Sequence, residues 1–486
     1  MSAPRTPPRP FAALRRPTGR AAEIWMLVFA AVIVTAALVI VELNQSRELT
    51  LQLAWYGLGY LAALAIAHLL IRTFAPYADP VLLPLVALLN GLGLVMIYRL
   101  DLARAAAGTA NCGVPADQPQ APTQLLWTGV ALLFLLATLM IVKDHTKLAE
   151  YSYTLLLLGV LFLALPSVLP ASLSEVNGAK IWIKIPGLLS IQPAEFAKIA
   201  LIVFAAAFLT SKQQVLTGAG KKFLGLTLPR ARDLGPLLLA LVICLAVLVR
   251  GKDLGTSLLI FGVMLVMIYL ATSRVSWLII GLVGFGGGAY LAYRLFGHVR
   301  QRVDIWLHPF DDPTGDGYQL VQSLFGLGTG GIFGTGLGAG RPNIVPCAST
   351  DFIASGLGEE LGLVGLTVVL LCYLLLAGRG IRAGLSVGDT FGRLLAGGLA
   401  FTLVFQMFIV VGGVTRLIPL TGLTTPFLSY GGSSLLANYI ILALLVRISD
   451  SSRRPKDPPA PAAPKRESLN EAMTQVVPLT KRGDQE

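Results

Sequence analysis

The residues best suited to chemistry in this sequence are charged side chains at the edges of long apolar blocks. Glu195 and Lys198 are three residues apart where one block begins, so they would share one face of a helix whose first turn holds Pro193. Lys252 and Asp253 directly precede another block. As an exposed ion pair, Glu195 and Lys198 would contribute only about 0.3–0.5 kcal/mol. Ionisable residues on a buried helix more often mark a site or a pathway.

A long connection between two apolar blocks, residues 297–351, contains further carboxylates. Asp312 lies in the sequence Asp311-Asp312-Pro313, and Asp-Pro is a pair that favours turns. Within hydrogen-bonding reach of a hydroxyl, the same carboxylate would instead serve as a general base. The glycine-dense residues 326–340 lack the Lys-Ser/Thr ending and the preceding strand of a phosphate-binding loop, so we predict no nucleotide site.

A third polar segment, residues 416–430, is broken by proline and glycine and leads into the last apolar block. Such a segment is tolerated at membrane depth only where it lines a cavity or packs on protein. Glu359 and Glu360 fall within an apolar block, where a charge costs at least about 2.5–3.5 kcal/mol by insertion scales. Pairing between helices is the simpler interpretation, and both are secondary candidates together with Asp351. The four histidines have no metal-ligand spacing, so we assign no zinc site.

The apolar blocks that must position these residues predict an all-α polytopic membrane protein. Apolar residues make up 55% of the chain and charged residues 13%, whereas a soluble domain has about 25% charged residues. The mean hydropathy is +0.72. A spanning helix needs roughly 20 mostly apolar residues. This length predicts twelve spans, at about residues 24–43, 52–72, 80–98, 124–142, 153–171, 195–211, 234–249, 255–271, 276–296, 352–377, 393–412 and 427–447.

The charge pattern predicts the orientation of these spans. The Arg-rich start resembles a signal peptide, but the first apolar block is too long and no small-residue cleavage site follows, so we predict a retained span. An even number of spans places both termini on one side, and most of the 38 Lys and Arg residues fall there, as expected for the cytoplasm. The net charge of +12 then needs no nucleic-acid partner. Several of the basic residues on the outer side lie beside the polar segments.

The chain divides into four regions on this basis. Residues 1–23 and 449–486 are predicted to be disordered cytoplasmic tails, because they are rich in Pro, Ala and charge. Residues 24–79 hold two N-terminal spans, and residues 80–448 form the remaining membrane core. Of the four cysteines, Cys244 and Cys372 lie in spans, and Cys112 and Cys347 lie in outer loops; whether the last two pair is left open.

Four motifs together resemble the RodA/FtsW (SEDS) family of shape, elongation, division and sporulation proteins. They are NGAKIWI…IQPAEFAK, KDLGTS, DPTGDGYQLVQSLFGLGTGGIFGTGLG…STDFIASGLGEELGLVG and GGVTRLIPLTGLTTPFLSYGGSSLLAN. The resemblance covers about residues 80–448 and implies a ten-span core. The two additional spans before it are similar to the actinobacterial RodA type, which favours RodA over FtsW. Two departures are Ala194, where the family often has Ser, and Lys252, where it often has Pro.

The resemblance implies a peptidoglycan glycosyltransferase that polymerises lipid II on the outer face of the cytoplasmic membrane. Its expected roles are cell elongation and shape and possibly division, and its expected partner is a class B penicillin-binding transpeptidase. The essential loop aspartate of the family corresponds to Asp312, our candidate general base. The glutamate and lysine of its QPxExxK motif correspond to Glu195 and Lys198, which are expected to be catalytic residues together with Asp312.

The leaving group of that reaction is undecaprenyl pyrophosphate, whose developing negative charge needs basic groups or a divalent cation such as Mg²⁺ or Mn²⁺. No metal ligands are assigned, although Glu195 would either orient Lys198 or help to hold a metal. The residues expected to bind substrate are Lys180, Trp182, Lys184, Lys252, Asp253, Gln319, Arg416 and Ser429.

Two other functions fit parts of the same pattern. A flippase that moves lipid II would also use polar residues in broken spans, but it needs them near the midplane and reachable from both faces. A non-catalytic scaffold for the penicillin-binding protein is the other alternative, against which the loop carboxylates argue weakly. Because most motifs lie on the outer side, the enzyme is favoured.

Overall fold

The computed structural model describes most of the chain: residues 19–45, 48–108, 115, 117–176, 178–185, 189–217, 221–223, 226–228 and 234–455. Pro17–Arg453 form one compact unit. The second unit comprises Met1–Arg16 and Arg454–Glu486, and the structure describes only its residues 454–455. The predicted tails and Cys112 therefore lie largely outside the described residues.

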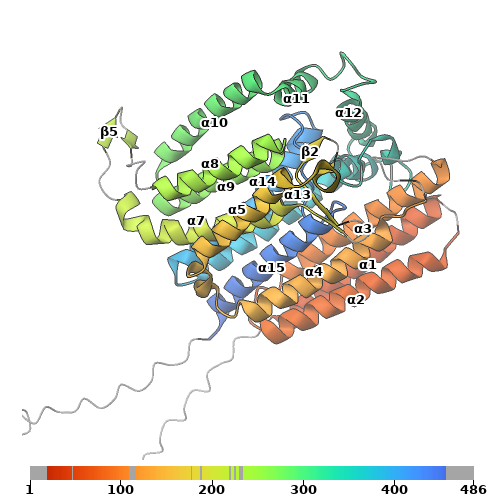
Figure 1. Ribbon diagram of the computed structural model, residues 1–486. Helices are drawn as coiled ribbons and strands as arrows, with labels where there is room; N and C mark the ends of the chain where they lie inside the picture. The colour runs from red at the N-terminus through yellow and green to blue at the C-terminus, as the bar shows by residue number, and fades with distance from the viewer. Residues whose placement is uncertain are drawn as a thin grey trace, which may run out of the picture. The chain divides into compact units, whose positions relative to one another are not determined.

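Every predicted span is a helix in the described part of the chain (Figure 1). The helices are α1 (Arg20–Gln45), α2 (Leu51–Phe74), α3 (Leu82–Ala107), α4 (Ala121–Ile141), α5 (Ser152–Val168), α7 (Pro193–Thr217), α8 (Gly235–Arg250), α9 (Leu254–Thr272), α10 (Val275–Leu295), α13 (Ile353–Ser386), α14 (Thr390–Val414) and α15 (Gly432–Arg453).

Length and composition qualify ten of these described helices to cross a membrane. The other two, α5 and α8, have 17 and 16 residues, fewer than the roughly 20 of a typical span. The prediction of an all-α polytopic membrane protein is confirmed, whereas twelve crossings remain a prediction. α1 begins at Arg20 and α15 ends at Arg453, so both helices extend a few residues into the segments predicted to be disordered.

Burial separates the central helices from the peripheral ones. In the most apolar stretch of α15, 89% of the residues are buried, and the value for α3 is 83%. Only 11% are buried in α10, which lies at the edge of the helical unit (Figure 1). The apolar side chains exposed on α10 suit contact with lipid, because lipid tails are as apolar as the side chains themselves.

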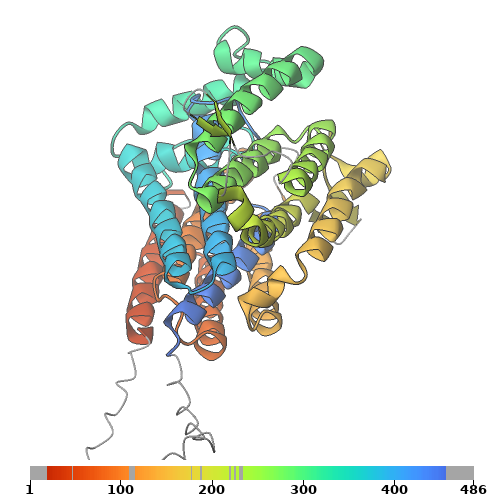
Figure 2. The same cartoon turned by 90° about the vertical axis from the view of Figure 1, so that its left-hand side faces the viewer.

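Smaller elements fill the connections between the spans. They are η1 (His145–Ala149), α6 (Ala171–Ser174), α11 (Gly297–Leu307), α12 (Tyr318–Gly330), η3 (Pro342–Ile344) and the antiparallel strand pairs β1 (Glu175–Val176) with β2 (Ala179–Lys180), β3 (Ile183–Ile185) with β4 (Leu189–Ile191), and β5 (Lys221–Phe223) with β6 (Leu226–Leu228). The connection 297–351 is therefore not a plain loop, since it contains α11 and α12. Both helices lie at one end of the compact unit (Figure 2).

α13 is interrupted at Gly362, where φ is 69° and ψ is −172°. The glycine loop (residues 331–340) enters this break. Its backbone forms hydrogen bonds with groups that the interruption of α13 leaves unpaired. Leu363 N donates to Gly331 O at 3.0 Å, and Gly336 N donates to Glu360 O at 3.0 Å. A methyl group on Gly362 would lie 2.3 Å from the backbone nitrogen of Gly334. The glycines thus permit a close backbone approach at a depth where unpaired backbone groups are costly.

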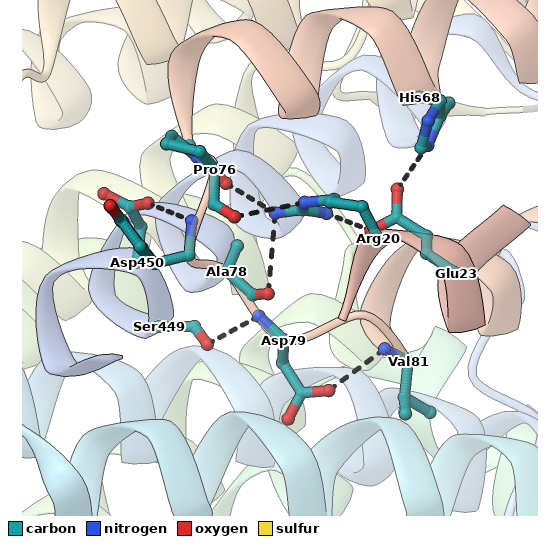
Figure 3. Close-up of polar contacts among 11 residues, drawn as sticks. Arg20, Glu23, His68, Pro76, Ala78, Asp79, Val81, Ser449 and Asp450 are labelled. Carbon is teal, nitrogen blue, oxygen red and sulfur yellow. Dashed lines mark hydrogen bonds and ion pairs between the residues drawn. The ribbon is translucent and has the colours of Figure 1, made fainter. Parts of the chain in front are cut away.

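The N-terminal helices are fixed at both ends of α1. At its start, Arg20 donates to the carbonyls of Ala75 at 2.6 Å and Pro76 at 3.2 Å, and it pairs with Glu23, which contacts His68 (Figure 3). The same connection reaches α15, because Asp79 N donates to Ser449 Oγ at 2.9 Å, as Figure 3 also shows.

At the other end of α1, two amides hold the glycine loop. Asn44 Nδ2 donates to Leu337 O at 2.6 Å, and Gln45 Nε2 donates to Gly338 O at 2.5 Å. The N-terminal helices therefore contact both the C-terminal helix and the loop that enters α13.

Candidate functional site

The Glu195–Lys198 pair lies in the first turns of α7 and is buried, with exposed fractions of 4% and 2%. Lys198 Nζ donates to Glu195 Oε2 at 2.5 Å and to Gln406 Oε1 on α14 at 2.9 Å. Gln406 Nε2 in turn donates to Thr424 O at 2.8 Å, in the broken segment 416–430. The predicted helix face is confirmed, and its two charges satisfy each other inside the protein.

Asp253 is the N-cap residue of α9 and interacts electrostatically with Glu195. It accepts hydrogen bonds from Thr256 N at 2.9 Å, Thr256 Oγ1 at 2.8 Å and Gln192 Nε2 at 3.3 Å. Burial raises the pKa of Asp253; the Thr256 bonds lower it, Glu195 raises it further and Arg302 lowers it. Asp253 therefore caps α9 and interacts electrostatically with Glu195 and Arg302.

A cavity of ≈ 380 Å³, the arginine cavity, opens between α11, α14 and the segment 416–430. Its polar lining residues are Lys252, His298, Gln301, Arg302, Asp316, Gln319, Asp351 and Thr421. Lys252 and Gln319 were predicted to bind substrate, and the structure brings them together here. Lys252 has φ of 65°, which a proline ring cannot adopt, so proline would require a different backbone at this position.

Arg302, on α11, is the principal cation that the sequence analysis missed. Its Nη1 donates to Leu420 O at 3.0 Å, and its charge faces Asp253 and Asp351. Burial lowers the pKa of Arg302 and the two carboxylates raise it. The same cation, together with Lys252, lowers the pKa of His298, which burial lowers most. The signal in the sequence was the spacing of four between His298 and Arg302, which places both on one helix face.

Asp351 lies opposite Arg302 across Gly422. A methyl group built on Gly422 would be 3.7 Å from Asp351 Oδ2 and 4.0 Å from Arg302 Nη2. Burial raises the pKa of Asp351 to about 6, although Arg302 and a hydrogen bond from Thr350 act in the opposite direction. The arginine cavity thus contains a carboxylate with a raised pKa beside the basic side chains of Lys252 and Arg302.

Asp312 lines an adjoining cavity of ≈ 610 Å³, the aspartate cavity. Its other charged or titratable lining residues are Arg300, Asp304, His308, Asp311 and Asp316, and it shares Gln301, Ile305 and Asp316 with the arginine cavity. The exposed Asp312 carboxylate accepts Gly315 N at 2.9 Å and Asp316 N at 3.0 Å. The turn interpretation of Asp-Pro is therefore confirmed, and the role as general base remains a prediction.

Six of the eight predicted substrate-binding residues, Asp253 among them, line neither of these two cavities. Arg416 donates to Trp306 O at 2.9 Å and Leu307 O at 2.6 Å, and Ser429 Oγ donates to Thr350 O at 2.6 Å. These bonds hold the backbone on either side of the arginine cavity. On the short strands, Lys184 Nζ donates to Glu175 O at 2.6 Å, Trp182 is half-buried and Lys180 is exposed.

The two glutamates named as secondary candidates differ in their ion pairs. Glu360 pairs with Arg99 on α3 at 2.8 Å, which confirms pairing between helices, whereas no ion pair joins Glu359 to any described residue.

Cys347 is disulfide-bonded, Cys244 and Cys372 are free, and Cys112 lies outside the described residues. Within the described residues, no group of three or more His, Cys, Asp or Glu side chains is placed to hold a metal ion.

Comparison with known proteins gives one consistent family. The model of the FtsW/RodA/SpoVE family, described as cell cycle proteins, matches residues 79–454. The peptidoglycan glycosyltransferase RodA of Mycobacterium bovis is 58% identical over 441 residues, which cover 90% of this chain and 92% of that protein. An alignment this long includes residues before 79, so the mycobacterial protein also matches part of the N-terminal helices. The stage V sporulation protein E of Bacillus subtilis is 35% identical, covering 77% of this chain and 98% of that protein.

Solved structures agree. A chain from work on the structural coordination of polymerization and crosslinking by a peptidoglycan synthase complex aligns with a TM-score of 0.62 at 27% identity, covering 78% of this chain and 99% of that one. A mutant of the rod shape determining protein RodA of Thermus thermophilus aligns with a TM-score of 0.52 at 26% identity, again covering 78% of this chain and 99% of that one.

Proposed function

This chain belongs to the FtsW/RodA/SpoVE family, and we infer that it is a multi-pass membrane peptidoglycan glycosyltransferase of the RodA type. Its substrate is lipid II, which it polymerises on the outer face of the cytoplasmic membrane with both termini in the cytoplasm. The observation that carries this proposal is the junction of a cation-lined cavity with a cavity that contains Asp312. The similarity to a chain of a peptidoglycan synthase complex supports a class B penicillin-binding transpeptidase as the partner.

The arginine cavity suits the pyrophosphate of the donor. Lys252 and Arg302 are fixed cations in a partly enclosed space, where their attraction for a developing negative charge is stronger than in water. The nearby carboxylate of Asp351 is kept partly protonated by burial, so it repels the anion less than a fully ionised group would. Gln319 adds a neutral donor on the same wall.

Asp312 suits the acceptor side of the reaction. A sugar hydroxyl of the acceptor attacks the anomeric carbon of the donor; the new C–O bond forms as the bond to pyrophosphate breaks, and the pyrophosphate leaves with the electron pair. Asp312 receives the hydroxyl proton. Each carboxylate oxygen has two lone pairs, and the bonds from Gly315 and Asp316 use one on each, so an acceptor site remains on both.

The predicted residues Glu195 and Lys198 lie outside the two cavities and hold one wall of the arginine cavity in place. Glu195, Lys198 and Gln406 join α7 and α14 to the segment that forms one wall of the arginine cavity. We assign Lys198 a positioning role, because its charge is already satisfied inside the protein. The donor set of a Mg²⁺ or Mn²⁺ site is not assembled among the described residues, so no step is assigned to a metal, and a cation requirement stays a prediction.

The decisive experiment compares glycan polymerisation and lipid II movement in liposomes that contain the purified protein, with and without its transpeptidase. Asp312→Asn should reduce polymerisation by at least about 100-fold, the lower end of a general-base contribution. Asp117→Asn, at an exposed outer-loop position away from both cavities, is the control and should polymerise at the wild-type rate. An active Asp312→Asn protein would remove Asp312 as the base. Movement of lipid II without polymer would support the flippase.

A further inference from the structure

A third cavity, the glutamate cavity, lies apart from the two cavities described above. It has a volume of ≈ 250 Å³ and lies between α12, the glycine loop and the outer part of α13. The side chains that matter below are Phe325 on α12, Arg341 and Ile344 in the connection to α13, and Glu359 on α13. The break in α13 at Gly362 turns this outer part of the helix toward the loop.

Glu359 is a buried carboxylate whose charge is not balanced by a cation in the described part of the chain. It is only 5% exposed, and its neighbour Glu360 takes the available Arg99. Oε1 of Glu359 accepts Arg341 N at 2.6 Å. No described residue donates a hydrogen bond to Oε2. A buried carboxylate without a cation is unfavourable, so this oxygen provides a strong attraction for a positively charged donor.

The space in front of Oε2 is kept open by a glycine. A methyl group on Gly326 would lie 3.1 Å from Oε2, and Gly326 itself lines the cavity. Gly340 leaves space beside the other carboxylate oxygen, because a methyl group on Gly340 would lie 3.0 Å from Oε1. Since both glycines also line the cavity, the free oxygen faces a space that a small ligand group can enter.

The second charge of the cavity is positive. Arg341 is exposed, and its guanidinium forms no hydrogen bond or ion pair with the described residues. Its backbone nitrogen donates to Glu359, and both residues line the cavity. A ligand that fits both must carry an ammonium group close to an anionic group, and guanidinium is well suited to phosphate.

The rim of the cavity is apolar and faces outward. Phe325 is 57% exposed and Ile344 is 44% exposed. Exposed apolar side chains beside a polar site are typical of the membrane interface, where acyl chains cover them. We propose that the glutamate cavity binds the head group of an aminophospholipid, with its primary ammonium on Glu359 and its phosphate on Arg341.

The experiment measures lipid binding to the purified full-length protein by native mass spectrometry. Three lipids with identical acyl chains are titrated, carrying ethanolamine, choline or glycerol head groups. The ethanolamine lipid should bind about tenfold more tightly than the other two, because choline cannot donate a hydrogen bond and glycerol carries no ammonium. Equal binding of all three would overturn the proposal and would favour a basic side chain of a partner protein as the occupant.

Variants assign the selectivity to the two residues. Glu359→Gln keeps the acceptor for Arg341 N but removes the charge, so it should abolish the preference for ethanolamine over choline. Arg341→Gln should weaken all three phospholipids to a similar degree while the ethanolamine preference remains. Glu150→Gln, at an exposed position outside the cavity, is the control. Because thermal unfolding is measured on each variant, a Glu359→Gln protein that is folded and still selective would overturn the proposal.

Discussion

Replacing Lys198 with alanine leaves the carboxylate of Glu195 buried without its cation. Glu195 is 4% exposed, and Lys198 is the residue that pairs with it. Removing one partner of a buried ion pair costs about 3–5 kcal/mol. Gln406 also loses the donor to its amide oxygen. Since a folded domain is stable by only about 5–15 kcal/mol, we expect a clear loss of thermal stability, accompanied by loss of activity.

A charge-neutral double variant separates instability from chemistry. In Glu195→Gln with Lys198→Met, no charge remains buried, so most of the lost stability should return. Polymerisation of lipid II is then measured at equal amounts of folded protein. Because we assign Lys198 a positioning role, the double variant should recover activity in parallel with stability.

Lys212→Ala provides the matched control, because Lys212 is an exposed lysine on the same helix α7. It should change neither quantity. A Lys198→Ala protein with a wild-type unfolding temperature would refute the reasoning from the buried pair. A double variant that is stable yet inactive would show instead that the Glu195–Lys198 pair does more than stabilise the fold.

Three further expectations follow from the geometry. Gly362→Ala places a methyl group against the glycine loop at a positive φ and should lower the unfolding temperature markedly, whereas Gly378→Ala, with no atom within 4 Å of its added methyl, should not; equal effects would contradict the packing at the break. Gly315→Ala puts a methyl group 2.1 Å from Asp312 Oδ2, so polymerisation should fall while thermal stability changes little, and a fully active variant would show that the position of this carboxylate is unimportant. The pKa of Asp351 is raised to about 6, so the folded protein binds more protons than the unfolded chain between about pH 4 and 6. Stability measured by denaturant titration should therefore decrease as the pH rises through that window, and Asp351→Asn should reduce this slope; an unchanged slope would contradict the assignment.

The helices were predictable because their length and composition are set by the membrane. The interruption of α13 was not, since Gly362 lies inside an apolar block and nothing local distinguishes it from a glycine in a continuous helix. Its left-handed backbone depends on the glycine loop, which is about 30 residues earlier in the sequence and meets α13 only in the fold. For the same reason, the loop 297–351 could be recognised as special without its helices α11 and α12 being found.

In the candidate site, too, contacts within one helix were predictable and contacts between distant segments were not. The shared helix face of Glu195 and Lys198 depends on spacing along one helix and was predicted. Arg302 and Asp351 come close to each other beside Gly422, although the three residues are far apart in the sequence. Sequence spacing therefore could not predict this contact. The sequence did not indicate that Arg416 donates to the backbone carbonyls of Trp306 and Leu307, and its binding of substrate stays a prediction.

The attachment of α1 at both of its ends bears on how this protein can be shortened. A truncated chain that starts at residue 79, where the family model begins, would lose the amides of Asn44 and Gln45 and leave the carbonyls of Leu337 and Gly338 without these donors. It would lose Arg20 together with the backbone carbonyls of Ala75 and Pro76 to which Arg20 donates, so this contact leaves no unpaired group behind. We therefore expect a chain cut at residue 79 to be less stable than the full chain. Anyone who trims it for structural or screening work will need to replace those donors on the remaining helices.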